Sequence, residues 1–345
     1  MDNYWISELI NYWIDRCDVK NNINNENIEK IYLILNNNNI GFHNFVLSKG
    51  NYENNDFKCE YDDNIIFTND GAKVRLFWYN DFFKKINNNY DFKFLLSHLD
   101  CHPKLECLNN IKMICFCGSS PNIENNNCIP ILDAHHLFEH KKNVEYNPNH
   151  ILDFNNDDFK NKINKINWRG GLYPTFKKKE LELLHLRKEV CEKYIKNKNF
   201  DVGYVGKIYY NDYPLLEKNR MSYKEMTSYK YILNIDGFGA SYDGTVWKLR
   251  STSLVIWITD ENNEMYWLQW YYPLLKPYVH YVPSSIDNLE KTFEWCENNQ
   301  EKCIEIIKSS TELIENILSN TEEYHKGLFD KLNEIYIQGN NNIIF

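Results

Sequence analysis

The segment 229–256 holds the residue types that a diphosphate site needs, in a suitable order. An apolar run predicts a strand that ends at Asp236, and a helix can start near Thr245. The turn between them contains small or flexible residues, namely Gly237, Gly239, Ala240, Ser241, Tyr242 and Gly244. Glycines permit a tight turn and close approach of a ligand to the backbone, and free N–H groups at a helix start attract anions. The alternative is an ordinary strand–turn–helix without a ligand.

Two cations, Lys248 and Arg250, follow in the predicted helix. They lie about 200° apart around a helix axis, so only one of them can face a ligand at the turn. The densest basic run, 177–180, is either a solvated helix start or a further group that faces phosphate.

Strands and helices alternate along the chain and must position this turn. Besides the strand before Asp236, strands are predicted at 42–47, 74–78, 92–96, 112–117, 166–170 and 200–205. Helices are predicted at 5–17, 28–35, 179–193, 265–272, 289–296, 301–318 and 321–336. The alternation indicates an α/β fold, and the polar stretch 140–165 indicates a domain boundary. Two Rossmann-like halves with a cleft between them are the simplest architecture for 345 residues.

Composition disfavours several classes of protein. The net charge of −9 argues against general nucleic-acid binding, which depends on clustered Lys and Arg. No apolar run approaches the ~18 residues of a transmembrane helix, and the N-terminal residues lack the features of a secretory signal. We therefore expect a cytoplasmic protein, within a host cell or virion if it is viral, whose ten cysteines are reduced and mostly buried. Asparagine runs predict loops and are typical of AT-rich genomes, as in some protists and large DNA viruses.

A zinc site is the remaining possibility that the cysteines and histidines raise. Its ligands would come from Cys101, His102, Cys107, His135 and His136. Their spacing matches no standard zinc pattern, so we expect no metal.

Five groups of short motifs occur in the order of one known family. They are His98-Leu99-Asp100-Cys101-His102-Pro103; Trp168-Arg169-Gly170-Gly171; Tyr229-Lys230-Tyr231 with Asn234-Ile235-Asp236-Gly237; Ser241 with Ser253-Leu254-Val255; and Trp267 with Tyr272-Pro273, Lys276-Pro277, His280-Tyr281 and Pro283. As an ordered set, they resemble glycosyltransferase family 90 over roughly residues 90–320. That family includes protein O-glucosyltransferases and O-xylosyltransferases, fungal capsule xylosyltransferases and bacterial lipopolysaccharide-modifying enzymes.

The resemblance implies a GT-B fold, in which two Rossmann-like domains face each other across a cleft. Residues 1–155 would form the acceptor-side domain, residues 156–310 would bind a UDP-sugar, and residues 311–345 would return as helices to the N-terminal domain. The implied reaction is inverting transfer of a hexose or pentose, with glucose and xylose favoured, to a hydroxyl of a glycan or protein. The resemblance implies no cofactor beyond the UDP-sugar and no divalent metal in the chemical step.

The resemblance makes Asp100 the candidate general base, because the catalytic aspartate of relatives lies in a short motif that ends in proline. Inverting transfer needs a carboxylate to take the proton of the acceptor hydroxyl as its oxygen attacks the anomeric carbon. His98 and His102 flank Asp100 and are candidates for hydrogen bonds to it or for acceptor contacts. The alternative is an aspartate that braces the turn. Leu99 stands where relatives have an arginine.

For the donor, the resemblance implies contacts from Trp168, Arg169, Gly170 and Gly171. A basic residue is expected a few positions later, and Lys178 is the candidate. An arginine can bind phosphates through forked, charge-assisted hydrogen bonds, whereas a buried arginine paired with a core carboxylate would be structural.

Within the turn, Asp236 and Gly237 match the Asp-Gly pair of the family. The protein glucosyltransferases place an arginine soon after this turn, where the present chain has Asp243. The donor phosphates would therefore rely on backbone N–H groups and on Lys248 or Arg250.

The last motif, 276–281, is expected to enter a strand at the cleft, where His280 would either contact the donor sugar or pack structurally. Two hypotheses of function follow. One is an active UDP-sugar-dependent glycosyltransferase. The other is a nucleotide-sugar-binding or scaffold protein with a degenerate active site, motivated by the departures from the family at Leu99, Gly171, Asp243 and Trp257.

Overall fold

The computed structural model describes residues 4–17, 45–51, 56–59, 79, 82–83, 86, 94–97, 115–122, 128–132, 154–155, 157–176, 183–205 and 214–341. The chain forms two compact units. Unit 1 comprises Met1–Lys141, Leu268–Tyr271 and Asn320–Phe345, and unit 2 comprises Lys142–Trp267 and Tyr272–Ser319. Both units therefore contain segments that are far apart in the sequence.

Unit 1 contains a five-stranded mixed sheet in the order β2-β1-β3-β4-β6. Its strands are β1 (Phe45–Asn51), β2 (Asp56–Cys59), β3 (Phe94–Ser97), β4 (Cys115–Cys117) and β6 (Cys128–Pro130). β1 pairs in antiparallel fashion with β2 and β3, whereas β3, β4 and β6 are parallel. The sheet is thus parallel on one side and antiparallel on the other.

The first and last helices pack together in unit 1, namely α1 (Tyr4–Arg16) and α12 (Thr321–Asn341). The ring of Trp5 stacks on that of Tyr324 with centres 6.5 Å apart. Gly327 permits the close approach, because a Cβ there would lie 3.0 Å from the Cδ1 atom of Ile10. The helices predicted at both ends of the chain are confirmed.

Unit 2 contains a five-stranded sheet in the order β10-β7-β11-β12-β14, and every pairing in it is parallel. Its strands are β7 (Ile163–Gly170), β10 (Phe200–Tyr204), β11 (Tyr229–Asn234), β12 (Leu254–Ile258) and β14 (Val282–Ser284). All five residues of β12 are buried, which is typical of a parallel strand covered on both faces. We call the end of this sheet at which the strands finish the carboxyl edge, and the opposite end the amino edge.

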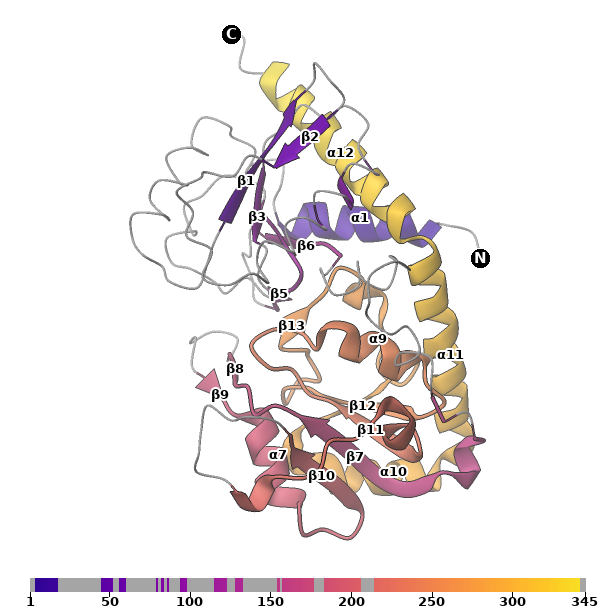
Figure 1. The fold of residues 1–345 in the computed structure, drawn as a ribbon. Helices are drawn as coiled ribbons and strands as arrows, with labels where there is room; N and C mark the ends of the chain where they lie inside the picture. The colour runs from indigo at the N-terminus through magenta and orange to yellow at the C-terminus, as the bar shows by residue number, and fades with distance from the viewer. Residues whose placement is uncertain are drawn as a thin grey trace. The chain divides into compact units, whose positions relative to one another are not determined.

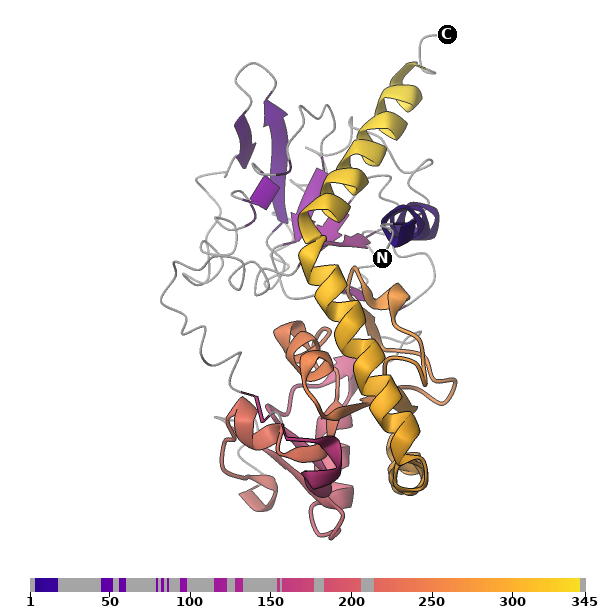
Figure 2. The same cartoon turned by 90° about the vertical axis from the view of Figure 1, so that its right-hand side faces the viewer.

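Helices cover both faces of this sheet (Figure 1). The described residues of unit 2 form the helices α7 (Leu186–Tyr194), α8 (Tyr223–Met226), α9 (Tyr242–Arg250), α10 (Leu289–Asn298) and α11 (Gln300–Ser319). α7 and α10 lie on one face and α9 on the other (Figure 1). The long α11 runs beside α9 (Figure 2), and the Ser310 hydroxyl donates to the Leu249 carbonyl at 3.1 Å.

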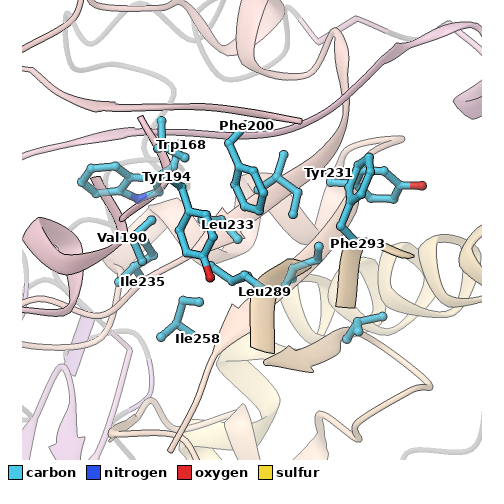
Figure 3. Packing of buried hydrophobic residues seen from close by; sticks show 14 of the residues in the cluster. Trp168, Val190, Tyr194, Phe200, Tyr231, Leu233, Ile235, Ile258, Leu289 and Phe293 are labelled. Atoms are coloured by element: carbon cyan, nitrogen blue, oxygen red, sulfur yellow. The ribbon is translucent and has the colours of Figure 1, made fainter. Parts of the chain in front are cut away.

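The main core of unit 2 lies on the α7 and α10 face, where aromatic and aliphatic side chains interlock (Figure 3). Tyr231, Leu233 and Ile235 point into this core. Ile232 points to the opposite face, where it packs with Trp247 of α9. Because side chains alternate along a strand, the polar residues 234 and 236 share the α9 face with Ile232.

The α/β fold predicted from the sequence is confirmed, and so are the helices predicted at 289–296 and 301–318. The helix predicted at 265–272 is wrong. That segment contains the short strand β13 (Trp267–Leu268) and a 3-10 turn that begins at Tyr272. Seven of its eight side chains are buried, so it lacks the polar face of an amphipathic helix.

The helix predicted at 179–193 begins later, at Leu186. A two-stranded ladder, β8 (Thr175–Phe176) with β9 (Leu183–Leu184), precedes it. The GT-B arrangement of the two halves stays a prediction. Among the described residues, no helix combines the length and the apolar character needed to cross a membrane.

Candidate functional site

The strand order of unit 2 creates a topological switch point. From β7 the chain passes to β10 on one side, and it then crosses to β11 on the other side of β7 before continuing outward to β12 and β14. Doubly wound sheets bind ligands at the carboxyl edge where the strand order reverses. In unit 2 that position lies beyond Gly170 at the end of β7 and Asn234 at the end of β11. Two motifs singled out in the sequence, 168–171 and 235–237, therefore meet there.

The start of α9 lies directly after the loop of β11. The Ser241 hydroxyl donates to the Ile235 carbonyl at 3.0 Å, and the Gly237 N–H donates to the Gly239 carbonyl at 3.0 Å, which closes the turn. Ser241 is the N-cap residue, but its side chain makes no capping bond to the helix. Ser241 thus leaves the N–H groups of the first turn without a bond from its own hydroxyl, and this end of a helix attracts anions.

A buried polar cluster joins β11 to α9. The Lys248 ammonium donates to Oδ1 of Asn234 at 2.9 Å, and Nδ2 of Asn234 donates to the Thr245 hydroxyl at 3.3 Å. The Thr245 and Tyr272 hydroxyl oxygens lie 2.8 Å apart. Lys248 is only 7% exposed, so this cation is held against the carboxyl end of β11.

Arg250 leaves α9 in another direction. Its Nε atom donates to Oε1 of Glu315 in α11 at 2.7 Å. The geometric argument that only one of the two cations faces the turn therefore favours Lys248. Gly244 lies beside it in α9, since a Cβ there would be 3.9 Å from the Lys248 Nζ atom.

Asp236 lies two residues after the end of β11 and is fully buried. No described group makes a hydrogen bond of ordinary geometry to either carboxylate oxygen. Burial raises the pKa of Asp236 to about 7, although Arg187, Lys248 and the N–H groups of Trp267 and Ser241 act in the opposite direction. A fully buried carboxyl with a raised pKa at the switch point marks a candidate site.

Arg187, near the start of α7, joins the ends of β7 and β11. Its Nε and Nη2 atoms donate to the Ile235 carbonyl at 3.2 and 2.9 Å, and Nη1 donates to the Gly171 carbonyl at 3.1 Å. Its guanidinium carbon lies 5.9 Å from the centre of the Trp168 ring. A Cβ at Gly237 would lie 2.9 Å from that carbon, so any larger residue there would displace the arginine.

Arg187 is not among the site residues predicted from the sequence. It stands next to Lys188 in a charged helix start, and nothing in the local pattern separates the two cations. Its role becomes visible only in its contacts with Gly171 and Ile235, which lie 16 and 48 positions away from it along the chain.

Arg169 is engaged away from the switch point. Its Nη2 atom lies 2.7 Å from Oδ1 of Asp201 on β10, and Nε and Nη1 donate to backbone carbonyls. Lys218 and the Tyr229 hydroxyl also donate to Asp201, and these bonds hold the pKa of its carboxyl below the ordinary value despite burial. This is the structural alternative, a buried arginine paired with a carboxylate.

The glycines of the Trp168–Gly171 motif make room for aromatic rings. A Cβ at Gly170 would lie 2.7 Å from Cζ2 of Trp168, and one at Gly171 would lie 2.7 Å from Cε2 of Tyr173. A tyrosine ring is therefore packed over position 171, which is one of the departures from the family.

His280 lies at the other end of the sheet. It precedes β14, whose first residue pairs with Ile256 in the middle of β12, so it stands at the amino edge. Its Nδ1 atom accepts the N–H of Lys276 at 2.9 Å, which closes a turn that Tyr278 enters at φ 58°. Burial, together with the charge of Lys276, lowers the pKa of His280 to about 4. The structure thus does not bring His280 together with Asp236.

Four candidate residues lie outside the described residues, namely His98, Asp100, His102 and Lys178. So do the five residues considered for zinc. Tyr242 opens α9, but its side chain is not described. The described part of the chain contains no group of three His, Cys, Asp or Glu side chains that could hold a metal. Six of the described cysteines have placed side chains, and all six are buried and free, as predicted for the cysteines in general. They are Cys17, Cys117, Cys128, Cys191, Cys296 and Cys303.

Comparison with known proteins identifies the family. The sequence pattern of glycosyl transferase family 90 matches residues 142–335, which is more than half of the chain. The chain belongs to glycosyl transferase family 90. The match spans the whole sheet of unit 2 together with α7 to α11, so the switch point lies within the family region.

Several known proteins are similar to part of this chain. Protein O-glucosyltransferase 1 of Homo sapiens is 35% identical over 92 residues, which are 26% of this chain and 22% of the human protein. The uncharacterized protein 179R of Invertebrate iridescent virus 6 is 33% identical over 114 residues, which are 32% of this chain and 10% of the viral protein. The uncharacterized protein 027R of Frog virus 3 is 29% identical over 108 residues, or 31% of this chain and 11% of that protein. The similarity thus covers about a fifth or less of the length of each of these three proteins.

Proposed function

We propose that this chain is an inverting glycosyltransferase that moves a hexose or pentose, with glucose or xylose favoured, from a UDP-sugar to a hydroxyl of a glycan or protein. One observation carries the proposal. Within the family region, the start of α9, the buried Lys248 and the buried carboxyl of Asp236 meet at the switch point of a doubly wound sheet. This combination offers positive charge for a diphosphate and an acceptor for ligand hydroxyls.

On the donor side, we assign the diphosphate to the N–H groups at the start of α9, with Lys248 supplying charge. Gly237, Gly239 and Ala240 allow the ligand to approach the backbone. Asp236 would accept hydrogen bonds from sugar or ribose hydroxyls. Arg169 remains a donor contact only if it leaves Asp201, so we assign it to the sheet instead.

On the acceptor side, we assign Asp100 as the general base, with His98 and His102 beside it. The acceptor oxygen attacks the anomeric carbon from the face opposite the leaving group, and its proton passes to the Asp100 carboxylate. The bond from the anomeric carbon to the β-phosphate oxygen breaks, and UDP departs with the electron pair. The start of α9 and Lys248 would stabilise the charge that develops on UDP, without a metal ion.

A thermal-shift panel tests the donor assignment. UDP-glucose, UDP-xylose, UDP-galactose and GDP-mannose are compared with free UDP. A ligand at about 100 times its dissociation constant adds ~2.7 kcal/mol of stability, so a true donor should raise the melting temperature clearly. If none of these nucleotides shifts the transition, the donor assignment fails.

The Asp100→Asn variant tests the base. It should abolish transfer and leave UDP binding nearly unchanged, because the amide cannot take the proton. The matched control is Asp287→Asn, whose carboxylate is exposed and pairs with Lys193. Full transfer activity in Asp100→Asn would contradict the assignment.

A nucleotide-sugar-binding protein without transfer activity is the second candidate. Two observations favour it. Arg169 is committed to Asp201, and Trp257, which stands where relatives have a lysine, is buried against Tyr272 with ring centres 4.9 Å apart. Assays of UDP-sugar hydrolysis and transfer separate the two candidates, since binding without turnover across many acceptors supports the second.

A further inference from the structure

Two exposed aromatic side chains stand on the two loops of the switch point. Tyr173 follows β7 and is 42% exposed, and Phe238 follows β11 and is 45% exposed. Their ring centres lie 5.6 Å apart, with the planes inclined at 46°. A single exposed aromatic ring is common on a protein surface, but two rings in contact on loops at a ligand-binding edge indicate a binding surface.

The loops that carry this aromatic pair are held in place. Arg187 bonds to the carbonyls of Gly171 and Ile235, which are two and three residues before the rings. The Tyr173 ring packs over Gly171, and the bond from Gly237 N–H to Gly239 closes the turn that presents Phe238. The rings are thus positioned before any ligand arrives, which reduces the ordering that binding requires.

The distance along the chain links the aromatic pair to the anion-binding end of α9. Phe238 precedes the N-cap residue Ser241 by three positions, so at most ~11 Å of chain separates them. A nucleotide whose diphosphate lies at the start of α9 therefore has its base within reach of the pair. Every nucleobase offers a flat π-face, and stacking on an aromatic side chain contributes ~1–3 kcal/mol per base.

We propose that Tyr173 and Phe238 stack on the nucleobase of the nucleoside diphosphate donor. This inference rests on the proposed function, since it assumes that a nucleoside diphosphate binds at the switch point. It adds a base subsite to the diphosphate subsite at α9, and it gives the exposed pair a ligand of defined chemistry.

The test compares ligands with and without a base. Binding of UDP and of inorganic pyrophosphate is measured by titration calorimetry for the wild type and for the double variant Tyr173→Ala/Phe238→Ala. The double variant should lose about 5- to 150-fold in UDP affinity, the fold-change that corresponds to one stacked base. Its affinity for pyrophosphate should stay within about twofold of the wild type.

Two further variants keep the test clear of folding artefacts. Tyr173→Phe combined with Phe238→Tyr keeps both rings and should retain UDP affinity. Tyr278→Ala removes a ring of equal exposure, 45%, at the amino edge and should leave UDP binding unchanged. Far-ultraviolet circular dichroism checks that each variant is folded.

Three outcomes would overturn the inference while leaving the proposed function standing. They are unchanged UDP affinity in the double variant, an equal loss for UDP and pyrophosphate, and a loss confined to UDP-glucose with UDP unaffected. The last would assign the rings to the sugar. A wild-type protein that binds no nucleotide at all would overturn the proposed function as well.

Discussion

Each edge of the parallel sheet in unit 2 contains a buried ionisable residue, and the two residues differ in their hydrogen-bond partners. At the amino edge, the Lys162 ammonium donates to the carbonyls of Thr227 and Asn155 and to the Ser253 hydroxyl, the last two at 3.1 and 3.0 Å. At the carboxyl edge, no described group makes an ordinary hydrogen bond to Asp236. Lys162 is 5% exposed and Asp236 is fully buried.

Burial moves both residues toward their neutral forms, lowering the pKa of Lys162 to about 8 and raising that of Asp236 to about 7. The difference therefore lies in the partners. Lys162 ties the start of β7 to neighbouring backbone and has the contacts of a structural residue. Burial disfavours the ionised form of Asp236, and a local feature that opposes stability in this way is typical of a functional site.

The largest effect is expected from Asp236→Asn, measured as stability against pH. The folded protein keeps the Asp236 proton up to about pH 7, whereas the unfolded chain releases it near 3.8. The stability linked to this proton is complete below pH 3.8 and is lost as the pH rises through about 7. The shift corresponds to about 4 kcal/mol, so the variant should be more stable than the wild type by as much as this at high pH.

Urea denaturation at a series of pH values measures this effect. The exposed carboxylate control Asp287→Asn should keep the wild-type pH dependence. A decline in stability that is the same in Asp236→Asn and in the wild type would show that another group is responsible. If Asp236 also accepts ligand hydroxyls, the same variant should bind UDP-glucose more weakly while it becomes more stable.

The next effect concerns the other edge. Lys162→Met keeps the length of the side chain but leaves two carbonyls and a hydroxyl without their donor, and it should lower the free energy of unfolding by about 3 kcal/mol. Chemical denaturation measures the loss, and the exposed Lys160→Met serves as the control because its partner Glu301 is also exposed. Equal stability of the two variants would remove the contrast between the edges.

A smaller effect separates the two cations of α9. Lys248→Met should reduce UDP affinity about tenfold, because a charge-assisted contact to the diphosphate is lost. Arg250→Met breaks a half-exposed ion pair with Glu315, so it should lower stability by less than about 1 kcal/mol and leave UDP affinity unchanged. Calorimetric titration with UDP measures both, and a stronger effect of Arg250→Met would reverse the assignment.

The smallest effect is expected at His280. It lies at the amino edge and its Nδ1 atom is used within its own turn, so His280→Ala should change the affinity for UDP-glucose by less than about twofold. Comparison of UDP and UDP-glucose isolates the sugar. A selective loss for UDP-glucose would return His280 to the donor site.

The local structure of this site could be predicted from the sequence, but the contacts between residues far apart in the chain could not. The strand–turn–helix around Asp236 and the divergence of Lys248 and Arg250 follow from periodicity over a few residues. The pairing of Arg169 with Asp201 could not be read from the sequence, because the partners lie 32 positions apart on neighbouring strands. Arg187 was missed for the same reason. The segment 265–272 was misassigned because burial on all sides removes the periodic signal on which such predictions depend.

The pairing of α1 with α12 bears on the order in which the protein can fold during its synthesis. The ribosome makes Tyr324 long after Trp5, yet their rings stack in unit 1. His325, also in α12, accepts the backbone N–H of Leu132 at 2.9 Å. Unit 2 ends at Ser319, so all its residues have been made before α12 exists. Unit 1 contains α1 but also needs α12, so it can complete its fold only after every residue of unit 2 has been made.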